Sequence, residues 1–253
     1  MKEDRIINAM PDQYVYGIVP ADSSIPPGLS GVQGEPVDVL TAGDYAAVVT
    51  AIGDADALGT PDNLLAHSAV LDAIAAAGPV LPMVFGTVVP GADVLVDEIL
   101  PSMQDSYAAG LHRVRNAVQF TVQARYVRDV VLAEIVAGNP EVARLREATA
   151  GLSEEASHFD RVRLGELVVE ELQQKAAGDS AAIVDALTPL ARETVTREAS
   201  QADDVVELAA LVDRDAQERF EQEVENLAKQ SAGRITFRLL GPQAPYDFVG
   251  EEA

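Results

Sequence analysis

Two stretches of the chain alternate between apolar and polar residues, which is the pattern of a strand with one buried face. Apolar side chains occupy every second position from Val118 to Tyr126, and the positions between them hold Gln119, Thr121, Gln123 and Arg125. Residues 235–239 alternate in the same way. We therefore expect a half-buried strand with a solvated polar face at residues 118–126, and a last strand at residues 235–239.

Continuous apolar runs rich in aromatic and β-branched residues predict further strands. These runs cover residues 14–19, 37–40, 45–52, 80–85, 193–200 and 205–212. The short segment Thr41–Asp44 suits a hairpin between two of these strands. Residues 21–35 contain two prolines and three glycines and are expected to form a loop, and the polar residues 1–13 are expected to fray.

Spacings of three and four residues between apolar positions predict the helices. Pro61 begins the first helix with Thr60 as its N-cap, and Gly78 ends it. Its apolar face is expected to comprise Leu64, Leu71, Ile74 and Ala75. A second helix at residues 92–109 is interrupted or kinked at Pro101. In the second half of the chain we expect helices at residues 129–137, 153–176, 180–190 and 216–227.

The order of these elements predicts an α+β fold with two domains. Residues 117–240 follow the order strand, helices, strand, strand, helix, strand, which is typical of the split βαβ, ferredoxin-like fold. The first half has a related but different order of strands and helices. We place an N-terminal α+β sheet domain at residues 1–112, a ferredoxin-like domain with a helical insertion at residues 113–240, and a tail that packs on the body at residues 241–253.

The charge of the chain is strongly negative and unevenly distributed. Among 253 residues, 41 Asp and Glu face 18 Lys and Arg, for a net charge of -23, and no basic residue occurs between Arg5 and Arg113. The first half therefore offers no cation to a phosphate or carboxylate, which excludes kinases, P-loop enzymes and most enzymes with anionic substrates from this half. Because the surface repels phosphate backbones, we expect no nucleic-acid partner.

The cysteine content and the N-terminal sequence exclude further kinds of site and indicate where in the cell the protein is expected. The chain has no cysteine, which excludes disulfides, thiolate metal sites and cysteine nucleophiles. Its first residues are acidic and no apolar signal-peptide core follows, so we expect a cytoplasmic protein. The uncharged run at residues 73–92 is long enough to cross a bilayer, but it contains six Pro and Gly residues, so we expect no membrane span.

A search for catalytic and metal-binding patterns gives a negative expectation. His67, His112 and His158 are 45 and 46 residues apart, far from the spacing of metal ligands, so each is interpreted as a core or surface residue. Adjacent acid pairs such as Glu170–Glu171 point about 100° apart on a helix and do not converge on one substrate atom. We predict no catalytic residue, no metal and no cofactor.

Two segments are more apolar and richer in Pro and Gly than a surface loop requires. Residues 81–90 read Leu-Pro-Met-Val-Phe-Gly-Thr-Val-Val-Pro, and the tail at residues 239–249 places three more apolar residues after two prolines. The prolines stiffen the tail, and its aromatic side chains would otherwise lie in water. The tail is therefore expected to pack on the body and lock the two domains together, or to form part of a partner-binding surface.

At these segments the chain resembles the gas vesicle proteins of the F/L type. That family opens with a Tyr-x-Tyr-Gly-Ile-Val strand, continues with an alanine-valine strand and a His-containing helix that leads to Leu-Pro-x-Arg-Phe-Gly-Thr, and ends with Leu-x-Gly-Pro-x-x-Pro-Tyr-x-Phe. The motif residues, which are also our candidates for partner contacts, are Tyr14, Tyr16, Gly17, Leu81, Pro82, Phe85, Gly86, Thr87, Gly241, Pro242, Pro245, Tyr246 and Phe248.

The chain departs from the family pattern at two places. Val84 stands where the family usually has Arg, and Gln243–Ala244 stand where Trp-Pro is common. A role of that Arg or Trp cannot be transferred to this chain. The resemblance implies a non-enzymatic accessory or minor structural protein of gas vesicles. It would act on the small, very hydrophobic shell protein, and on other accessory proteins, during nucleation and assembly.

A second hypothesis assigns the chain to a different class of protein. A ferredoxin-like sheet hosts many functions, so the chain could instead be a small-molecule sensor or an enzyme. Convergent polar groups with perturbed pKa values in a deep pocket would favour that alternative, whereas a flat apolar face would favour a binding protein.

Overall fold

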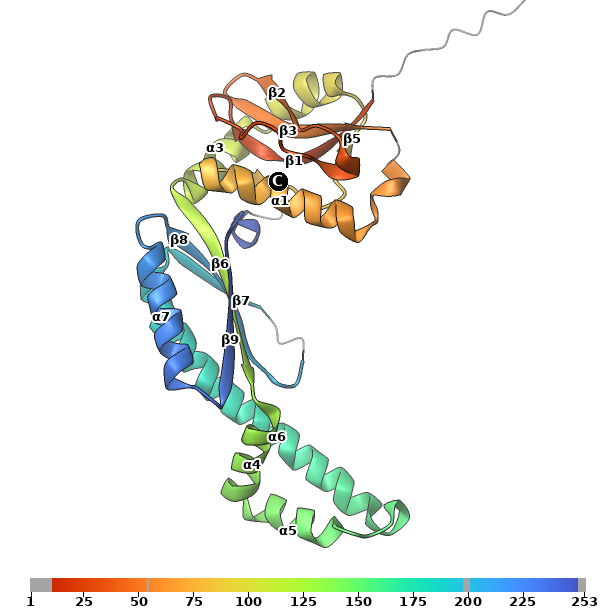
Figure 1. Cartoon of the computed structure of the whole chain (residues 1–253), viewed down its shortest axis with the longest axis vertical. Coiled ribbons are helices and arrows are strands. Elements are labelled where there is room, and N and C mark those ends of the chain that lie inside the picture. Colours follow the sequence, from red (N-terminus) through yellow and green to blue (C-terminus); the bar gives the residue numbers. More distant parts are fainter. Residues whose placement is uncertain (1–10, 54, 198–200, 250–253) are drawn as a thin grey trace, which may run out of the picture. The chain divides into compact units, whose positions relative to one another are not determined.

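The computed structural model describes residues 11–53, 55–197 and 201–249 (Figure 1). Of residues 1–13, which were expected to fray, residues 1–10 lie outside the described residues, as does the end of the strand expected at residues 193–200. Asp12 and Gln13 contradict the expectation, because they belong to a strand. Contacts divide the chain into two compact units, residues 1–119 with 241–253, and residues 120–240. We call them the N-terminal unit and the C-terminal unit. The residues of the tail thus belong to the N-terminal unit.

The N-terminal unit is built on a five-stranded sheet. Its strands are β1 (Asp12–Pro20), β2 (Asp38–Ala42), β3 (Tyr45–Ile52), β4 (Leu81–Pro82) and β5 (Val88–Val89). The order is β2-β3-β1-β4, and β5 also pairs with β1. The antiparallel pair β2–β3 confirms the predicted hairpin, and β1 confirms the first predicted strand.

This sheet is buried on both faces. In β3, Ala46 and Val48 pack into one core, and Ala47 and Val49 pack into another on the opposite face. A β-bulge between Val15 and Gly17 shifts the alternation in β1 by one residue. Because a bulge inserts one extra residue, the side chains before and after it can keep to the face that the core requires.

Helices cover the two faces. Helix α1 (Pro61–Ala77) packs into the first core and has the predicted N-cap, since the Thr60 hydroxyl accepts a hydrogen bond from the Asn63 N–H. Leu64 was expected on its buried face, but its side chain is 49% exposed, and Asn63 and His67 are buried instead. Both are polar and make hydrogen bonds in the interior, which apolar periodicity does not predict.

The second predicted helix is interrupted, but at Met103 and not at Pro101. A π-helical segment (Val94–Ile99) runs into α2 (Leu100–Ser102), and α3 (Gln104–Val114) begins after a break at Met103. The strand expected at residues 80–85 is shorter than predicted. Only Leu81–Pro82 pair with β1, and the chain then turns so that Val84 is 79% exposed.

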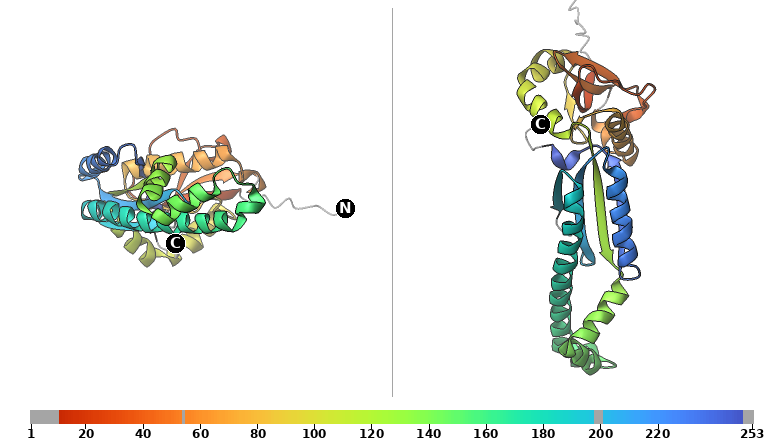
Figure 2. Two further views of the ribbon diagram at one scale, coloured as in Figure 1. Left: turned by 90° about the horizontal axis from the view of Figure 1, so that it is seen from below. Right: turned by 90° about the vertical axis from the view of Figure 1, so that its left-hand side faces the viewer.

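The C-terminal unit has the predicted ferredoxin-like order. Its four-stranded antiparallel sheet comprises β6 (Ala117–Tyr126), β7 (Glu193–Arg197), β8 (Asp204–Asp213) and β9 (Ile235–Gln243), in the order β7-β8-β6-β9. Helices α6 (Glu154–Leu187) and α7 (Gln217–Gln230) both contact β8 and each other. They therefore lie on the same face of this sheet (Figure 2).

Three details of the C-terminal unit differ from the expectation. Gln119 and Thr121 of β6 are buried, so only the second half of that strand has a solvated face. The helices expected at residues 153–176 and 180–190 form the single helix α6, since Gly178 is exposed and does not interrupt it. Helix α5 (Pro140–Thr149) was not predicted and follows α4 (Arg128–Gly138).

Short 3-10 helices complete the structure at Val32–Gly34, Ala55–Leu58, Thr188–Leu190 and Tyr246–Phe248. Among the described residues, no helix is both long enough and apolar enough to cross a membrane.

Candidate partner-binding site

Five aromatic rings from distant parts of the sequence meet in the N-terminal unit. We call Tyr14, Tyr16, His67, Phe85 and Tyr246 the aromatic cluster. The ring of His67 stacks on Tyr16 at a centroid distance of 5.8 Å and lies edge-on to Tyr14 and Phe85 at 5.7 and 5.6 Å. Tyr246 lies 6.3 Å from His67. The cluster thus joins β1, α1, the turn after β4, and the tail.

Hydrogen bonds fix the centre of the cluster. The Tyr14 hydroxyl lies 2.8 Å from His67 Nδ1 and accepts a hydrogen bond from the Gly86 N–H at 3.3 Å. When the Tyr14 hydroxyl donates its proton to Nδ1, that nitrogen acts as an acceptor and carries no hydrogen. The proton of the neutral imidazole is then on Nε2. Burial lowers the pKa of His67 to about 4 and raises the pKa of Tyr14 to about 12. Both side chains are therefore neutral near pH 7.

Tyr16 connects the cluster to the loop after β1. Its hydroxyl accepts a hydrogen bond from the Val32 N–H at 2.8 Å and lies 3.0 Å from Thr50 Oγ1. Because the Thr50 hydroxyl donates to the Pro36 carbonyl, Tyr16 is the donor to Thr50. A Cβ atom on Gly31 would lie 2.2 Å from the Tyr16 hydroxyl, so this loop can approach only because residue 31 is glycine.

The same requirement holds where β1 meets β4. Gly17 faces Pro82, and a Cβ atom on Gly17 would lie 2.6 Å from the Leu81 carbonyl oxygen. Leu81 and Pro82 are buried. These three motif residues therefore allow two backbones to pack closely, and they are not available to a partner.

The turn at residues 83–87 is the exposed part of the central motif. The Thr87 hydroxyl donates to the Val84 carbonyl at 2.7 Å, and Gly86 has a positive φ of 94°, which favours glycine. Phe85 is half-buried and points its ring at Tyr14 and His67. Val84 lies at the tip of this turn, in solvent.

The tail is held by contacts within the same unit. The Ala244 N–H donates to Asp72 Oδ1 at 3.1 Å, and the Asp247 N–H donates to Gln119 Oε1 at 3.0 Å. Ala244 and Phe248 are buried, and so is Pro245. Burial and the charge of Asp72 hold the pKa of Tyr246 above its ordinary value. The tail is therefore packed on the N-terminal unit.

The structure brings four of the predicted site residues together in one cluster, but not as a surface. Tyr14, Tyr16, Phe85 and Tyr246 share one cluster, whereas Gly241 and Pro242 are exposed at the end of β9, joined by a cis peptide bond. Sequence reasoning missed Asp72, because a single acid on a helix carries no signal of a contact with residue 244. His67 was interpreted as a core or surface residue, and it is in the core.

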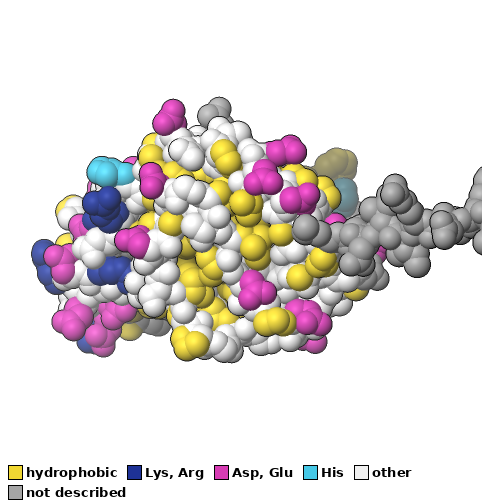
Figure 3. Space-filling view, turned by 90° about the horizontal axis from the view of Figure 1, so that it is seen from above, with side chains coloured by type: hydrophobic (Ala, Val, Ile, Leu, Met, Phe, Trp, Pro, Cys, Tyr) yellow, Lys and Arg dark blue, Asp and Glu magenta, His cyan; other side chains and the backbone are white. Residues whose placement is uncertain are grey.

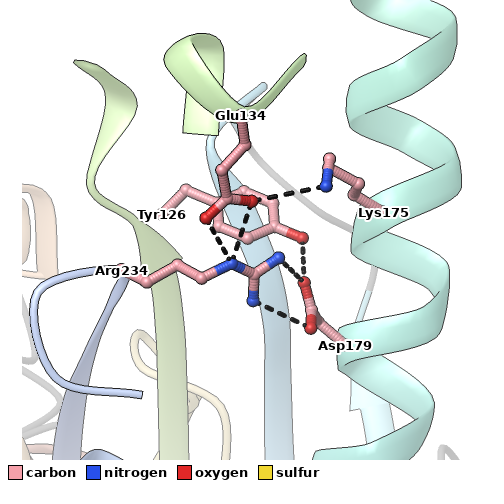
Figure 4. A network of polar contacts seen from close by, with 5 residues as sticks. All are labelled: Tyr126, Glu134, Lys175, Asp179 and Arg234. Atoms are coloured by element: carbon pink, nitrogen blue, oxygen red, sulfur yellow. Dashed lines mark hydrogen bonds and ion pairs between the residues drawn. The ribbon is translucent and has the colours of Figure 1, made fainter. Parts of the chain in front are cut away.

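A second polar cluster lies in the C-terminal unit (Figure 4). Arg234 donates to both carboxylate oxygens of Asp179, at 3.0 and 2.7 Å, and its Nε donates to Glu134 at 2.9 Å. Its guanidinium lies 5.3 Å from the centre of the Tyr126 ring, and the Tyr126 hydroxyl donates to Asp179. Burial alone would raise the pKa of Asp179, but the hydrogen bonds from Arg234 and Tyr126 outweigh it, so the pKa lies below its usual value.

The surface carries both apolar and acidic side chains and is hollowed by grooves. In the view of Figure 3, apolar and acidic side chains are interspersed over the middle of the face. Four surface grooves formed by described residues have volumes of about 340, 530, 320 and 390 Å³. The groups of the aromatic cluster and of the Arg234 network that have shifted pKa values, such as His67 and Asp179, do not line these four grooves.

The comparison with solved structures gives the fold. The chain matches the crystal structure of GvpF from Anabaena sp. PCC7120 with a TM-score of 0.80 at 22% identity, covering 96% of this chain and 100% of that chain. It matches the crystal structure of GvpF from Microcystis aeruginosa with a TM-score of 0.77 at 22% identity, covering 94% and 99%.

Sequence comparison gives the family. The chain is 30% identical over 239 residues to gas vesicle protein F of Streptomyces sp. (strain CB03234), covering 93% of this chain and 98% of that protein. It is 27% identical to gas vesicle protein L of the same strain, covering 94% and 92%. The family model described as "Gas vesicle synthesis protein GvpL/GvpF" matches residues 13–250. The chain therefore belongs to the GvpL/GvpF family of gas vesicle synthesis proteins.

Proposed function

We propose that this chain is a non-catalytic accessory or minor structural protein of gas vesicles, which binds the small hydrophobic shell protein and supports nucleation and assembly. Membership of the family supports the association with gas vesicles. The observation that carries the binding role is the turn at residues 83–87, which presents an apolar side chain to solvent from a fixed position. We further propose that the protein acts in the cytoplasm at the growing vesicle, together with other accessory proteins.

Burial separates the motif residues in the core from Val84, the non-motif side chain at the tip of the turn. Tyr14, Tyr16 and Leu81 are almost completely buried and stabilise the unit from inside. Val84, with 79% of its side chain exposed, stands on a turn that the aromatic cluster supports from beneath. A rigid turn loses little conformational entropy on binding, so an apolar tip of this kind suits a hydrophobic partner.

Two observations support the absence of catalysis. Among the described residues, no three His, Asp or Glu side chains are grouped so that they could hold a metal ion. His67 of the aromatic cluster and Asp179 of the Arg234 network have shifted pKa values, and neither lines any of the four grooves described above. No specific observation favours the sensor or enzyme alternative.

Co-expression with the shell protein, followed by affinity capture of this chain, tests the proposal. We expect the shell protein to be captured by the wild type, and Val84→Asp to reduce capture at least fivefold. Val39→Asp is the matched control, because Val39 is a 41% exposed valine of the same unit. Melting temperatures check that both variants fold. The binding role is wrong if the wild type captures no shell protein. If Val84→Asp captures as much as Val39→Asp, the contact lies elsewhere.

A further inference from the structure

One end of the C-terminal unit consists of α4, α5 and the first half of α6, which contact one another. We call these residues, 128–171, the three-helix extension, because they continue beyond the end of the sheet in Figures 1 and 2. Val131, Ile135, Val142, Leu145 and Leu167 form its buried interior. Apolar side chains on its outside are therefore additional to those that hold the helices together.

One outer face carries an apolar ridge. Phe159 is 87% exposed, and Val162 and Val169 are 49% and 52% exposed. On α6, Val162 follows Phe159 by three residues and Val169 follows Val162 by seven, so these side chains lie along one face. Glu155 precedes Phe159 by four residues and lies on the same face. We call these four residues the ridge. An aromatic side chain that is almost completely in water is unfavourable unless it has a partner.

The other side of α6 borders an apolar groove. Leu164 follows Val162 by two residues, about 200° around the helix. The groove has a volume of about 340 Å³ and lies between the three helices, with a lining of Leu132, Ala133, Val136, Val142, Leu164 and Val168. Asp129 and Arg146 are the charged residues of its lining. Arg146 makes no ion pair with any described residue.

We propose that the ridge of one copy of this chain packs into the groove of a second copy. The ridge presents a large apolar side chain, and the groove is an apolar recess of suitable size for an aromatic ring. Glu155 of the ridge has the opposite charge to Arg146 of the groove, so we expect these two residues to face each other across the contact, with Asp129, the other charged residue of the lining, away from Glu155. Because ridge and groove lie on opposite sides of α6, the contact is head-to-tail and adds further copies in a row.

The net charge predicts how this contact responds to salt. Two copies with a charge of -23 each repel one another, and added salt screens that repulsion over distances beyond about 8 Å at physiological ionic strength. Self-association should therefore strengthen with salt. Binding of a basic partner to the same surface would weaken with salt, so the direction of the effect distinguishes the two occupants.

Analytical ultracentrifugation of the full chain, in low and in high NaCl, tests the proposal. We expect wild-type species larger than a dimer that grow with protein concentration and with salt. Phe159→Glu removes the ridge and Val136→Glu blocks the groove, so each variant alone is expected to be monomeric. Leu65→Glu, at a 68% exposed leucine of the N-terminal unit, is the control and is expected to associate like the wild type.

Mixing the two defective variants is the decisive measurement. Phe159→Glu keeps an intact groove and Val136→Glu keeps an intact ridge, so the mixture should form a dimer with one copy of each and nothing larger. Circular dichroism checks folding, and Phe159→Ser replaces Phe159→Glu if the charge disturbs the helix. A wild type that stays monomeric in high salt, or a mixture that does not associate, would overturn the proposal.

Discussion

His67 is the clearest case in which one residue determines a measurable property of the whole chain. Burial lowers its pKa from 6.5 to about 4. Between these two pH values, His67 is therefore neutral in the folded protein and protonated in the unfolded chain. Stability should therefore fall as the pH decreases from about 6.5 to about 4, and should be independent of this group above that window.

The predicted size of this effect is about 2 kcal/mol between pH 7.5 and pH 5. Urea unfolding at both pH values, for the wild type and for His67→Gln, measures it. Many carboxylates contribute to the pH dependence of both proteins, so the quantity to compare is the difference between the two slopes. Equal slopes would mean that His67 is not buried in its neutral form.

Gly17 provides a second prediction at the residue scale. Gly17→Ala places a methyl group 2.6 Å from the Leu81 carbonyl oxygen, and a backbone oxygen cannot move without separating β1 from β4. We expect a loss of about 1 to 3 kcal/mol in the free energy of unfolding. Gly59→Ala is the matched control, since nothing lies within 4 Å of its added methyl group. Chemical denaturation of both variants tests this, and equal stabilities would contradict it.

At the scale of elements, the network around Arg234 is predicted to hold α4 and α6 against the start of β9. Arg234→Met removes a guanidinium that binds two carboxylates at once and leaves Asp179 and Glu134 facing each other. The side chains are 26 to 32% exposed, so the expected loss is about 1 to 2 kcal/mol, below that of a fully buried pair.

The control for this network is Lys229→Met. Lys229 pairs with Glu225 on the exposed surface of α7, where an ion pair contributes little. Arg234→Lys is informative as well, because an ammonium cannot reproduce the forked contact with Asp179. Hydrogen exchange should show faster opening of α4 in Arg234→Met and an unchanged rate in Lys229→Met. A uniform change across the chain would argue against a local clamp.

The elements also show what the sequence predicts and what it does not. The β2–β3 hairpin and the N-cap of α1 depend on neighbouring residues, and both were predicted. Helix α5 was missed although Asn139 and Pro140 mark its start, because its apolar positions are few. Two helices were predicted in place of α6, because glycine is unfavourable inside a helix. Burial of apolar side chains elsewhere on α6 outweighs this low propensity.

The candidate site was predictable only in part, for a similar reason. The motif residues could be named from the sequence, but their burial depends on contacts such as Ala244 with Asp72, which join residues 172 positions apart. Neither residue type nor spacing indicates such a contact. The distinction between the buried tyrosines and the exposed Val84 therefore required the structure.

At the scale of the whole molecule, the charge of -23 leads to the last prediction. Ion pairs between neighbouring side chains are few compared with 41 acidic residues, so repulsion among the remaining carboxylates destabilises the folded chain. Added NaCl screens this repulsion, and the melting temperature should rise between low and physiological salt. A protein whose surface is dominated by ion pairs would show the opposite change.

The measurement should use the Phe159→Glu variant at low concentration, because self-association would also raise the melting temperature of the wild type. Choline chloride at the same ionic strength is the control, since screening depends on ionic strength and not on the identity of the cation. A rise with both salts supports general repulsion among the carboxylates. A rise with NaCl alone would instead indicate that the carboxylates bind sodium, and a fall with both would show that local ion pairs outweigh the net charge.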